Sequence, residues 1–344
     1  MSGIKPERLQ LLLQQFIVTQ KLGDDVEGIL SSIKAYVNAE CLSTSISENE
    51  WTSSVAAIFA ALRVGMKLSI ASNKWVRDRI AYATVVHSCY KGLESRECLS
   101  VMGMLAKLPS FSPLLSCMLS NMDGDSVSLF ALLQAVYDLC FIVLYNKSLK
   151  DDFVSMKYIS LYGKVTYVCL EVASNRENDC QCRDMALKTL EALVDSSEEN
   201  CDSLTVVLPG ISTALANIVC QSASEHLRII ISSLKILSRT ICYCLADSVQ
   251  CNEEVASSLN LDPQVQELYV HRDDCWKAST AVNIKKLVGA LCSSLALHRD
   301  GDVRVTLLEC VYSLRNECRK AFKNSLDGFL LDLFLTTQLP SSSC

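Results

Sequence analysis

The tripeptide His-Arg-Asp, which opens the catalytic loop of protein kinases, occurs twice in this chain, at 271–273 and 298–300. In a kinase the Asp accepts the proton of the substrate hydroxyl, and an Asn five residues further on holds a magnesium ion. Ala278 and Val305 stand at that position here. The D-F-G and A-P-E motifs, the glycine-rich loop and the V-A-I-K lysine are also absent from the sequence. We therefore interpret both tripeptides as helix starts and predict no catalytic residue.

The second tripeptide fits a helix start in detail. The carboxylate of Asp300 or Asp302 can accept hydrogen bonds from the free N–H groups of a first turn. The apolar residues that follow recur at helical spacing, so they fall on one face of a helix. They are Val303, Leu307, Leu308, Val311 and Leu314.

The 18 cysteines are spread through apolar segments, and the N-terminus lacks the apolar region of a secretory signal. We expect reduced, mostly buried thiols. Structural zinc is usually held by two ligand pairs of the type C-x(2–4)-C or by Cys/His pairs. Cys180-x-Cys182 and Cys242-x-Cys244 are close cysteine pairs, but the four histidines form no second ligand pair. His87-x-Cys89 lacks the other elements of a zinc deaminase. We predict no metal and, because nucleotide-binding and nucleophile motifs are absent, no cofactor or small-molecule substrate.

The net charge is −6 and the isoelectric point is near 5.4, which predicts no general attraction to nucleic acid or to anionic membranes. One local exception is the stripe of Arg315, Arg319 and Lys323, which stand four residues apart and could take an anion on one helix face. Because Glu317 and Asp327 dilute this stripe, we expect a solvated outer face instead.

The longest apolar stretch, residues 128–145, is nearly long enough to cross a bilayer. Gln134 and Asp138 lie near its centre, where a membrane span would be penalised. We interpret the stretch as a buried helix and predict no membrane association.

Helix signals dominate the chain, because the 12 Gly and 6 Pro are too few for an all-β fold. Pro6 stands at a first-turn position, Ser47-x-x-Glu50 forms a capping box, and Asp262-Pro263 reads as an N-cap followed by proline. Residues 165–172 and 203–208 could be strands by their β-branched content, but two isolated strands make a poor sheet. The sequence predicts an all-α fold.

An apolar frame recurs along the helices, at 3, 4, 7 and 10 positions after an origin at Arg183, Leu227 or Arg304. A fainter copy begins at Arg77 and places His87 at the last position. The three origins are 44 and 77 residues apart, or one and about two units of the ~40 residues typical of HEAT-type helix pairs. The residues of the three strong frames are Ala186, Leu187, Leu190 and Leu193; Ile230, Ile231, Leu234 and Leu237; and Leu307, Leu308, Val311 and Leu314.

A pair of helices in ~40 residues cannot bury its own apolar face, so neighbouring pairs must stack. We expect one continuous HEAT/armadillo-like solenoid of antiparallel helix pairs over 1–344, in which an Arg one turn into each capped helix allows a ladder between successive repeats. The alternative is an ordinary α-bundle in which the spacing is coincidental.

The final third resembles a known family, that of Tel-two-interacting protein one, the larger Tti subunit of the Triple T complex. The resemblance covers roughly 205–335. It is carried by Trp276-x-x-x-Thr280-x-x-Asn283, Leu287, Leu291, His298, Val303-Arg304, Cys310, Cys318, the leucines from Leu326 to Leu335, Leu208-Pro209-Gly210 and the segment EHLRIIISSLKILSRTICYCLAD, which ends in Leu245-Ala246-Asp247.

The resemblance implies a long α-solenoid, of which this chain is an N-terminal portion, a short isoform or an incomplete gene model. It also implies a non-enzymatic cochaperone scaffold that acts in the cytoplasm and nucleus. The implied partners are the Tel and second Tti subunits, phosphatidylinositol-3-kinase-related kinases and a heat-shock chaperone. The resemblance assigns no partner-binding residue to a numbered position. A transport receptor or phosphatase regulatory subunit of HEAT type, and an all-helical enzyme, remain as alternatives.

The last apolar segment, residues 325–339, raises an expectation about association. Leu326, Phe329, Leu330, Leu333 and Phe334 form one stripe, which Leu331 and Leu335 widen. We expect this surface to be uncovered, so that the chain self-associates or binds a chaperone through it.

Overall fold

The structure, a computed structural model, describes residues 6–22, 24–41, 46–99, 108–122, 125–221, 225–248 and 263–337. These residues form helices and contain no strand, which confirms the predicted all-α solenoid class. The two β-branched segments are helical, within α9 (Ile159–Ser174) and α11 (Asp202–Cys220). The β-branched residues of 165–172 are buried on α9, whereas on α11 Thr205 is buried and Val206 and Val207 are half-buried. Packing of these helices overrides the weak local preference for strand.

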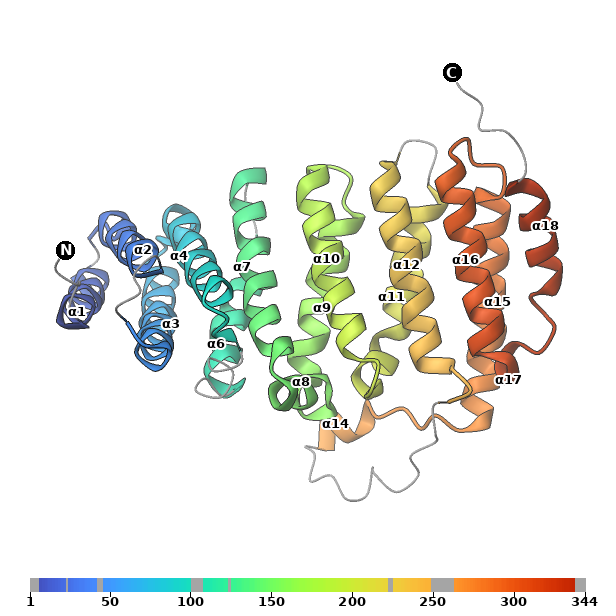
Figure 1. Ribbon diagram of the computed structural model, residues 1–344, viewed down its shortest axis with the longest axis horizontal. Helices are drawn as coiled ribbons and strands as arrows, with labels where there is room; N and C mark the ends of the chain where they lie inside the picture. Colours follow the sequence, from blue (N-terminus) through green and yellow to red (C-terminus); the bar gives the residue numbers. More distant parts are fainter. Residues whose placement is uncertain are drawn as a thin grey trace. The chain divides into compact units, whose positions relative to one another are not determined.

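The chain divides into two compact units, residues 1–153 and 154–344. In unit 1, α1 (Pro6–Leu22), α3 (Glu48–Ala71) and α6 (Leu108–Leu119) form one layer, in which each helix contacts the next. A second layer holds α2 (Glu27–Cys41), α4 (Trp75–Ser95) and α7 (Ser126–Tyr145). Successive helices pair across the layers, as Figure 1 shows. This is the arrangement of stacked helix pairs that a solenoid requires.

Unit 2 repeats the two-layer pattern. After α8 (Lys147–Val154) and a short 3-10 turn, α9, α11 and α15 (Asp274–Leu295) form one layer. The other layer holds α10 (Cys180–Ser196), α12 (Leu227–Leu245), α16 (Gly301–Glu317) and α18 (Asp327–Thr337), which lie side by side in Figure 1. Two short helices, α14 (Pro263–Glu267) and α17 (Arg319–Phe322), complete the unit. The expectation of one continuous domain over 1–344 stays a prediction.

The expected helix starts are found where the chain is described. The Ser47–Glu50 capping box opens α3, with the Ser47 and Glu50 groups bonded to each other's backbone amides. Pro6 opens α1 and Pro263 opens α14, while Asp262 lies outside the described residues.

The repeated apolar frame is buried in the three strong copies. Ala186, Leu190, Leu234, Leu307 and their frame partners are buried or nearly so. The fourth copy was placed wrongly, because Arg77 is exposed on α4. Its true origin is Arg79, which is 5% exposed. The residues 3, 4, 7 and 10 positions after Arg79 are all buried: Tyr82, Ala83, Val86 and Cys89.

The apolar stretch at 128–145 lies in α7, which packs against α4 and α6. Asp138 is fully buried there, and its carboxylate bonds to His87 Nδ1 at 2.8 Å and to Gln134 Nε2 at 2.9 Å. Burial raises the pKa of Asp138, although both hydrogen bonds oppose that change. By length and composition alone, three described helices are apolar enough to cross a membrane: α3, α7 and α11.

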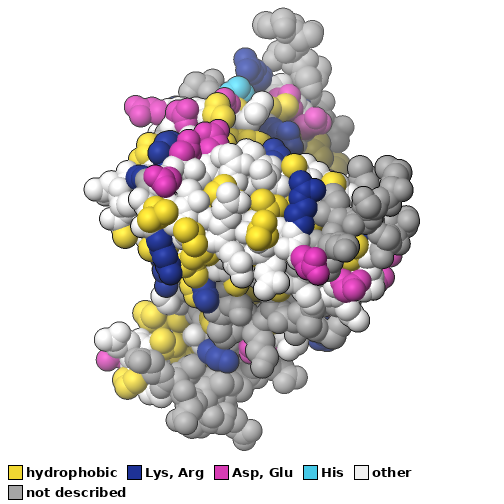
Figure 2. Space-filling model, turned by 90° about the vertical axis from the view of Figure 1, so that its left-hand side faces the viewer, with side chains coloured by type: hydrophobic (Ala, Val, Ile, Leu, Met, Phe, Trp, Pro, Cys, Tyr) yellow, Lys and Arg dark blue, Asp and Glu magenta, His cyan; other side chains and the backbone are white. Residues whose placement is uncertain are grey.

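The surfaces of the two units carry separate exposed apolar residues. Figure 2 views the side of the N-terminal helices, where hydrophobic, basic and acidic side chains are interspersed over the visible face. At α18, the expected stripe is split, because Leu326 and Leu333 are buried where α18 packs on α16. Leu331, Phe334 and Leu335 remain exposed, so only part of the expected surface is uncovered, and self-association stays a prediction.

Candidate functional site

Both His-Arg-Asp tripeptides start helices. The Asp273 carboxylate accepts a hydrogen bond from the Trp276 amide at 2.6 Å at the start of α15. Asp300 accepts one from the Asp302 amide at 2.8 Å at the start of α16. These are N-cap contacts, in which a carboxylate satisfies a free N–H group of the first turn. The prediction of two helix starts is confirmed.

Arg272 of the first tripeptide and Arg304 of the frame both secure segments near helix starts. Arg272 is buried and donates to the Asp202 carboxylate at 2.6 Å and to the Cys201 sulfur, which ties the start of α15 to the start of α11. Arg304 instead donates to the carbonyl of His298 at 2.6 Å, within its own helix entry. Arg272 thus links two helix starts that are far apart in the sequence, and Arg304 secures the entry of its own helix.

One contact of the expected ladder is present, between α10 and the entry of α12. Arg183 donates to both oxygens of Glu225 at 2.8 and 2.7 Å, and its Nε donates to the Ala173 carbonyl at 2.7 Å. The two side chains are 4% and 2% exposed, so this is a buried bidentate pair. Burial acts to raise the pKa of Glu225, but the Arg183 guanidinium and the His226 amide outweigh it and hold that pKa below its ordinary value.

The cysteines described in the structure are free thiols, and most of them are buried, as expected. Burial raises the pKa of the Cys292 thiol to about 11 and that of Cys310 to about 12. Thiols of that kind stay protonated at neutral pH and react slowly. Within the described ranges, no three His, Cys, Asp or Glu side chains come close enough to hold a metal ion.

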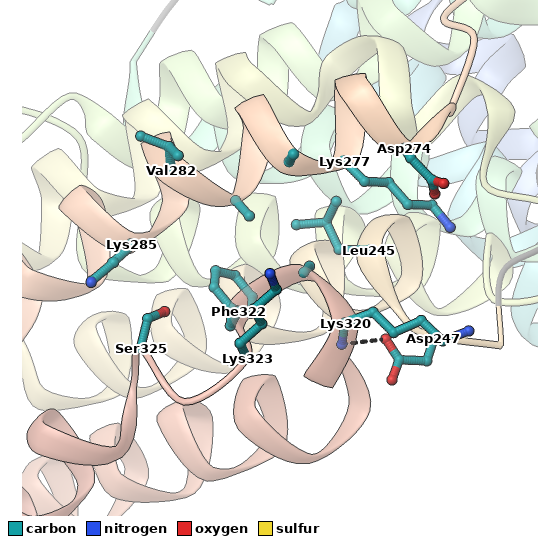
Figure 3. Close-up of a pocket in the computed structure, with 13 residues that line it drawn as sticks. Leu245, Asp247, Asp274, Lys277, Val282, Lys285, Lys320, Phe322, Lys323 and Ser325 are labelled. Carbon is teal, nitrogen blue, oxygen red and sulfur yellow. Dashed lines mark hydrogen bonds between the residues drawn. The ribbon is translucent and has the colours of Figure 1, made fainter.

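Unit 2 contains a groove of about 900 Å³ between α15, α17 and the C-terminal end of α12. Four lysines line it, and we call it the lysine groove (Figure 3). Asp274, Lys277, Ala281 and Lys285 are spaced three or four residues apart, so one face of α15 forms its first wall. Its other residues are Leu245, Asp247, Ala278, Val282, Lys320, Ala321, Phe322, Lys323 and Ser325.

The opposite wall is formed where the helix breaks after α16 and the chain changes direction. Cys318 ends α16 and α17 follows at once, so the chain turns back toward α12. The Lys320 amide donates to the Asp247 carboxylate at 2.9 Å, and the Asp247 amide donates to the Glu317 carbonyl at 2.8 Å. These two bonds fix the helix break against the end of α12 and position Lys320 at the groove. Figure 3 shows the bond between Lys320 and Asp247.

Lys323 occupies a tight turn at the rim. Its φ of 49° and ψ of −128° lie close to the first central position of a type II′ turn, a region that glycine favours. The Ser325 amide closes the turn with a 2.9 Å bond to the Phe322 carbonyl. A lysine therefore stands where the backbone prefers a residue without a Cβ.

The structure corrects the basic stripe expected at the end of α16. Arg315, Arg319 and Lys323 do not share one helix face, because α16 ends at Glu317. Arg315 pairs with Asp327 at 3.0 Å, whereas Lys323 lines the lysine groove. Sequence reasoning missed Lys277, Lys285 and Lys320. The helical spacing of Lys277 and Lys285 was the only available signal, and nothing in the sequence marks the break at Cys318.

Stacked helix pairs, buried inter-repeat ion pairs and a concave groove place the chain in the class of helical-repeat scaffolds. A family model described as the TTI1 N-terminal TPR domain matches residues 83–338, and the chain belongs to that family. The expected resemblance is thereby confirmed, and it begins well before residue 205.

Two curated relatives share sequence with the chain. TELO2-interacting protein 1 homolog of Homo sapiens is 29% identical over 154 residues, which are 44% of this chain. The Mus musculus protein of the same name is 28% identical over 163 residues, or 47% of this chain. Each match covers 14% of the relative's own length.

Proposed function

We propose that the protein is a non-enzymatic scaffold of the Tti type, which supports the folding, assembly and stability of phosphatidylinositol-3-kinase-related kinases. The observation that carries this proposal is the family match over residues 83–338, together with relatives whose name states that they interact with TELO2. Its partners in this role are a Tel subunit, a second Tti subunit, the kinases and a heat-shock chaperone. We place the activity in the cytoplasm, with a share in the nucleus.

The architecture supports a role in binding. Stacked helix pairs present long rows of side chains on each layer, and such surfaces suit extended contacts with other proteins. The buried Arg183–Glu225 pair fixes α10 against the entry of α12, so the surface of unit 2 has a defined geometry. A scaffold of this kind acts by positioning its partners, and its action needs no catalytic residue or cofactor.

Affinity purification tests the proposal. The full chain, tagged and expressed at its natural level in its own cells, is expected to retain the cell's TELO2 homologue and phosphatidylinositol-3-kinase-related kinases in amounts that scale with the bait. An untagged strain and an unrelated tagged helical-repeat protein serve as controls. Recovery of importin cargoes or phosphatase catalytic subunits in place of these proteins would contradict the proposal and favour another class of scaffold.

A further inference from the structure

We propose that the lysine groove binds a short acidic segment of a partner protein, whose carboxylates contact Lys285, Lys320 and Lys323 while an apolar side chain rests on the floor. This inference rests on the proposed scaffold function and names one surface through which the scaffold recognises a partner.

The charges of the groove favour an anion. Four lysines and two acidic residues line the groove, so its charge is positive, whereas the net charge of the whole chain is −6. Figure 3 shows Asp247 and Asp274 at one end, with Lys285 and Lys323 away from them. Lys285, Lys320 and Lys323 form no side-chain ion pair within the described part of the chain. Their charges are therefore available to an incoming carboxylate.

The floor favours a peptide over other anions. Leu245, Ala281 and Phe322 are buried beneath the lysines, and Val282 is exposed beside them. A peptide that carries both acidic and apolar side chains matches this combination. Single-stranded nucleic acid needs exposed aromatic rings on which its bases stack, and the one aromatic residue here, Phe322, is only 2% exposed.

The size of the groove sets the length of the segment. Asp274 and Lys285 mark the ends of the α15 wall, three helical turns apart. At the helical rise per residue this is roughly 16 Å, which an extended segment of about five residues spans. The occupant is therefore a short linear stretch and not a folded domain.

Lys323 supplies an independent observation. Its positive φ makes glycine the favoured residue at that position, yet the chain places a cation there, at the rim of the lysine groove. Backbone conformations of this cost are found where they position a side chain for a purpose. In the proposal, the strained backbone at Lys323 positions its ammonium group to contact a carboxylate of the partner.

A binding assay tests the proposal with the full chain. The probe is a fluorescein-labelled peptide of repeated Glu-Glu-Leu units, and the control peptide has Gln in place of each Glu. We expect the acidic peptide to bind roughly tenfold or more tightly than the neutral one, and Lys285→Glu with Lys323→Glu to weaken it by about the same factor. Lys286→Glu, an exposed lysine of α15 outside the groove, is the matched control and is expected to change binding less than about twofold.

A second variant separates binding from folding. Lys323→Gly removes the charge but suits the turn, so we expect a melting temperature at or above that of the wild type together with about threefold weaker peptide binding. Unchanged peptide binding in this variant would remove Lys323 from the proposed contacts.

Several results would overturn the proposal: no binding of the acidic peptide, equal binding of the neutral peptide, or an equal loss from Lys286→Glu. Tighter binding of a thymidine oligonucleotide or of phosphatidylserine vesicles would assign the groove to another class of partner, and equal competition by inorganic phosphate would reduce it to a simple anion site. If TELO2 still co-purifies in any of these cases, the groove assignment fails while the scaffold function stands.

Discussion

At the residue scale, Asp273 and Asp300 stand in a tripeptide known from kinase catalytic loops, yet both serve as helix caps. In each case the carboxylate lies just ahead of a helix and accepts a bond from a first-turn amide. The kinase interpretation failed on spacing alone, because no Asn follows at the required position. The helix caps were predictable from the sequence, because an N-cap depends only on residues that are neighbours in the chain.

The caps predict a graded response to substitution. Asp273→Asn should leave the free energy of unfolding nearly unchanged, because Asn caps a helix about as well as Asp. Asp300→Ala should lower it by about 1 kcal/mol, and adding Asp302→Ala should bring the loss to about 1–2 kcal/mol through the helix dipole. Urea unfolding followed by circular dichroism measures these values. A large loss from Asp273→Asn would show that this carboxylate does more than cap α15.

The Arg183–Glu225 pair predicts a larger effect. Arg183→Met removes the bidentate partner of a carboxylate that is 2% exposed and leaves it the more distant Arg176 guanidinium at 4.0 Å and the His226 amide. We expect a loss of about 3–5 kcal/mol in unfolding free energy. Arg239→Met is the matched control, because Arg239 is 40% exposed beside Glu191 and Asp195, and its loss should stay below about 1 kcal/mol. Equal losses from the two variants would contradict the buried ladder.

The same pair fixes the sign of a pH effect. The pKa of Glu225 is lower in the folded chain than its ordinary value of 4.5, so the stabilisation is complete above that value and is lost as the pH falls through the folded pKa. The stability difference between wild type and Glu225→Gln should therefore shrink below about pH 4.5. If this stability difference instead grew as the pH falls, the pKa of Glu225 would be raised in the folded chain and not lowered.

At the scale of elements, close helix contacts depend on glycine. A Cβ at Gly65 of α3 would lie 2.3 Å from Phe16 Cζ of α1 and 2.7 Å from the Tyr82 hydroxyl of α4. Phe16 and Tyr82 are fully buried and pack edge to face, so neither ring has room to move away. Gly65 therefore sets the distance at which three helices of unit 1 meet.

This geometry predicts opposite effects for two glycine substitutions. Gly65→Ala should destabilise the chain by about 1–3 kcal/mol through overpacking. Gly210→Ala in α11 meets no atom within 4 Å and should gain about 0.5–1 kcal/mol, since Ala favours helix. Thermal unfolding compares the two variants directly, and a stabilising Gly65→Ala would mean that α1 and α3 lie further apart.

The elements also show which parts of the molecule could be predicted from sequence. The frames at Arg183 and Arg304 were predicted because a buried helix face repeats at fixed spacing. In α4 the same spacing rule placed the origin of the apolar frame at Arg77 and not at Arg79. Both arginines precede apolar residues, and only the packing of the folded chain shows that Arg79 is the buried one. The lysine groove could not be predicted, because it joins α15 to a segment more than thirty residues away through a turn at Lys323 that no local signal marks.

At the scale of the whole molecule, the family match carries the account. It runs from residue 83 to 338, so it includes helices of both compact units. The chain spans 14% of the length of the curated relatives that it matches. Helical repeats can distribute binding over many surfaces.

The abundance of phosphatidylinositol-3-kinase-related kinases tests the central claim most directly. Acute depletion of the protein in its own cells should lower the steady-state level of these kinases severalfold while their transcripts stay constant, because kinases that fail to assemble are degraded. Re-expression should restore them, and the levels of unrelated kinases should not change. Unaltered kinase levels after complete depletion would contradict the account.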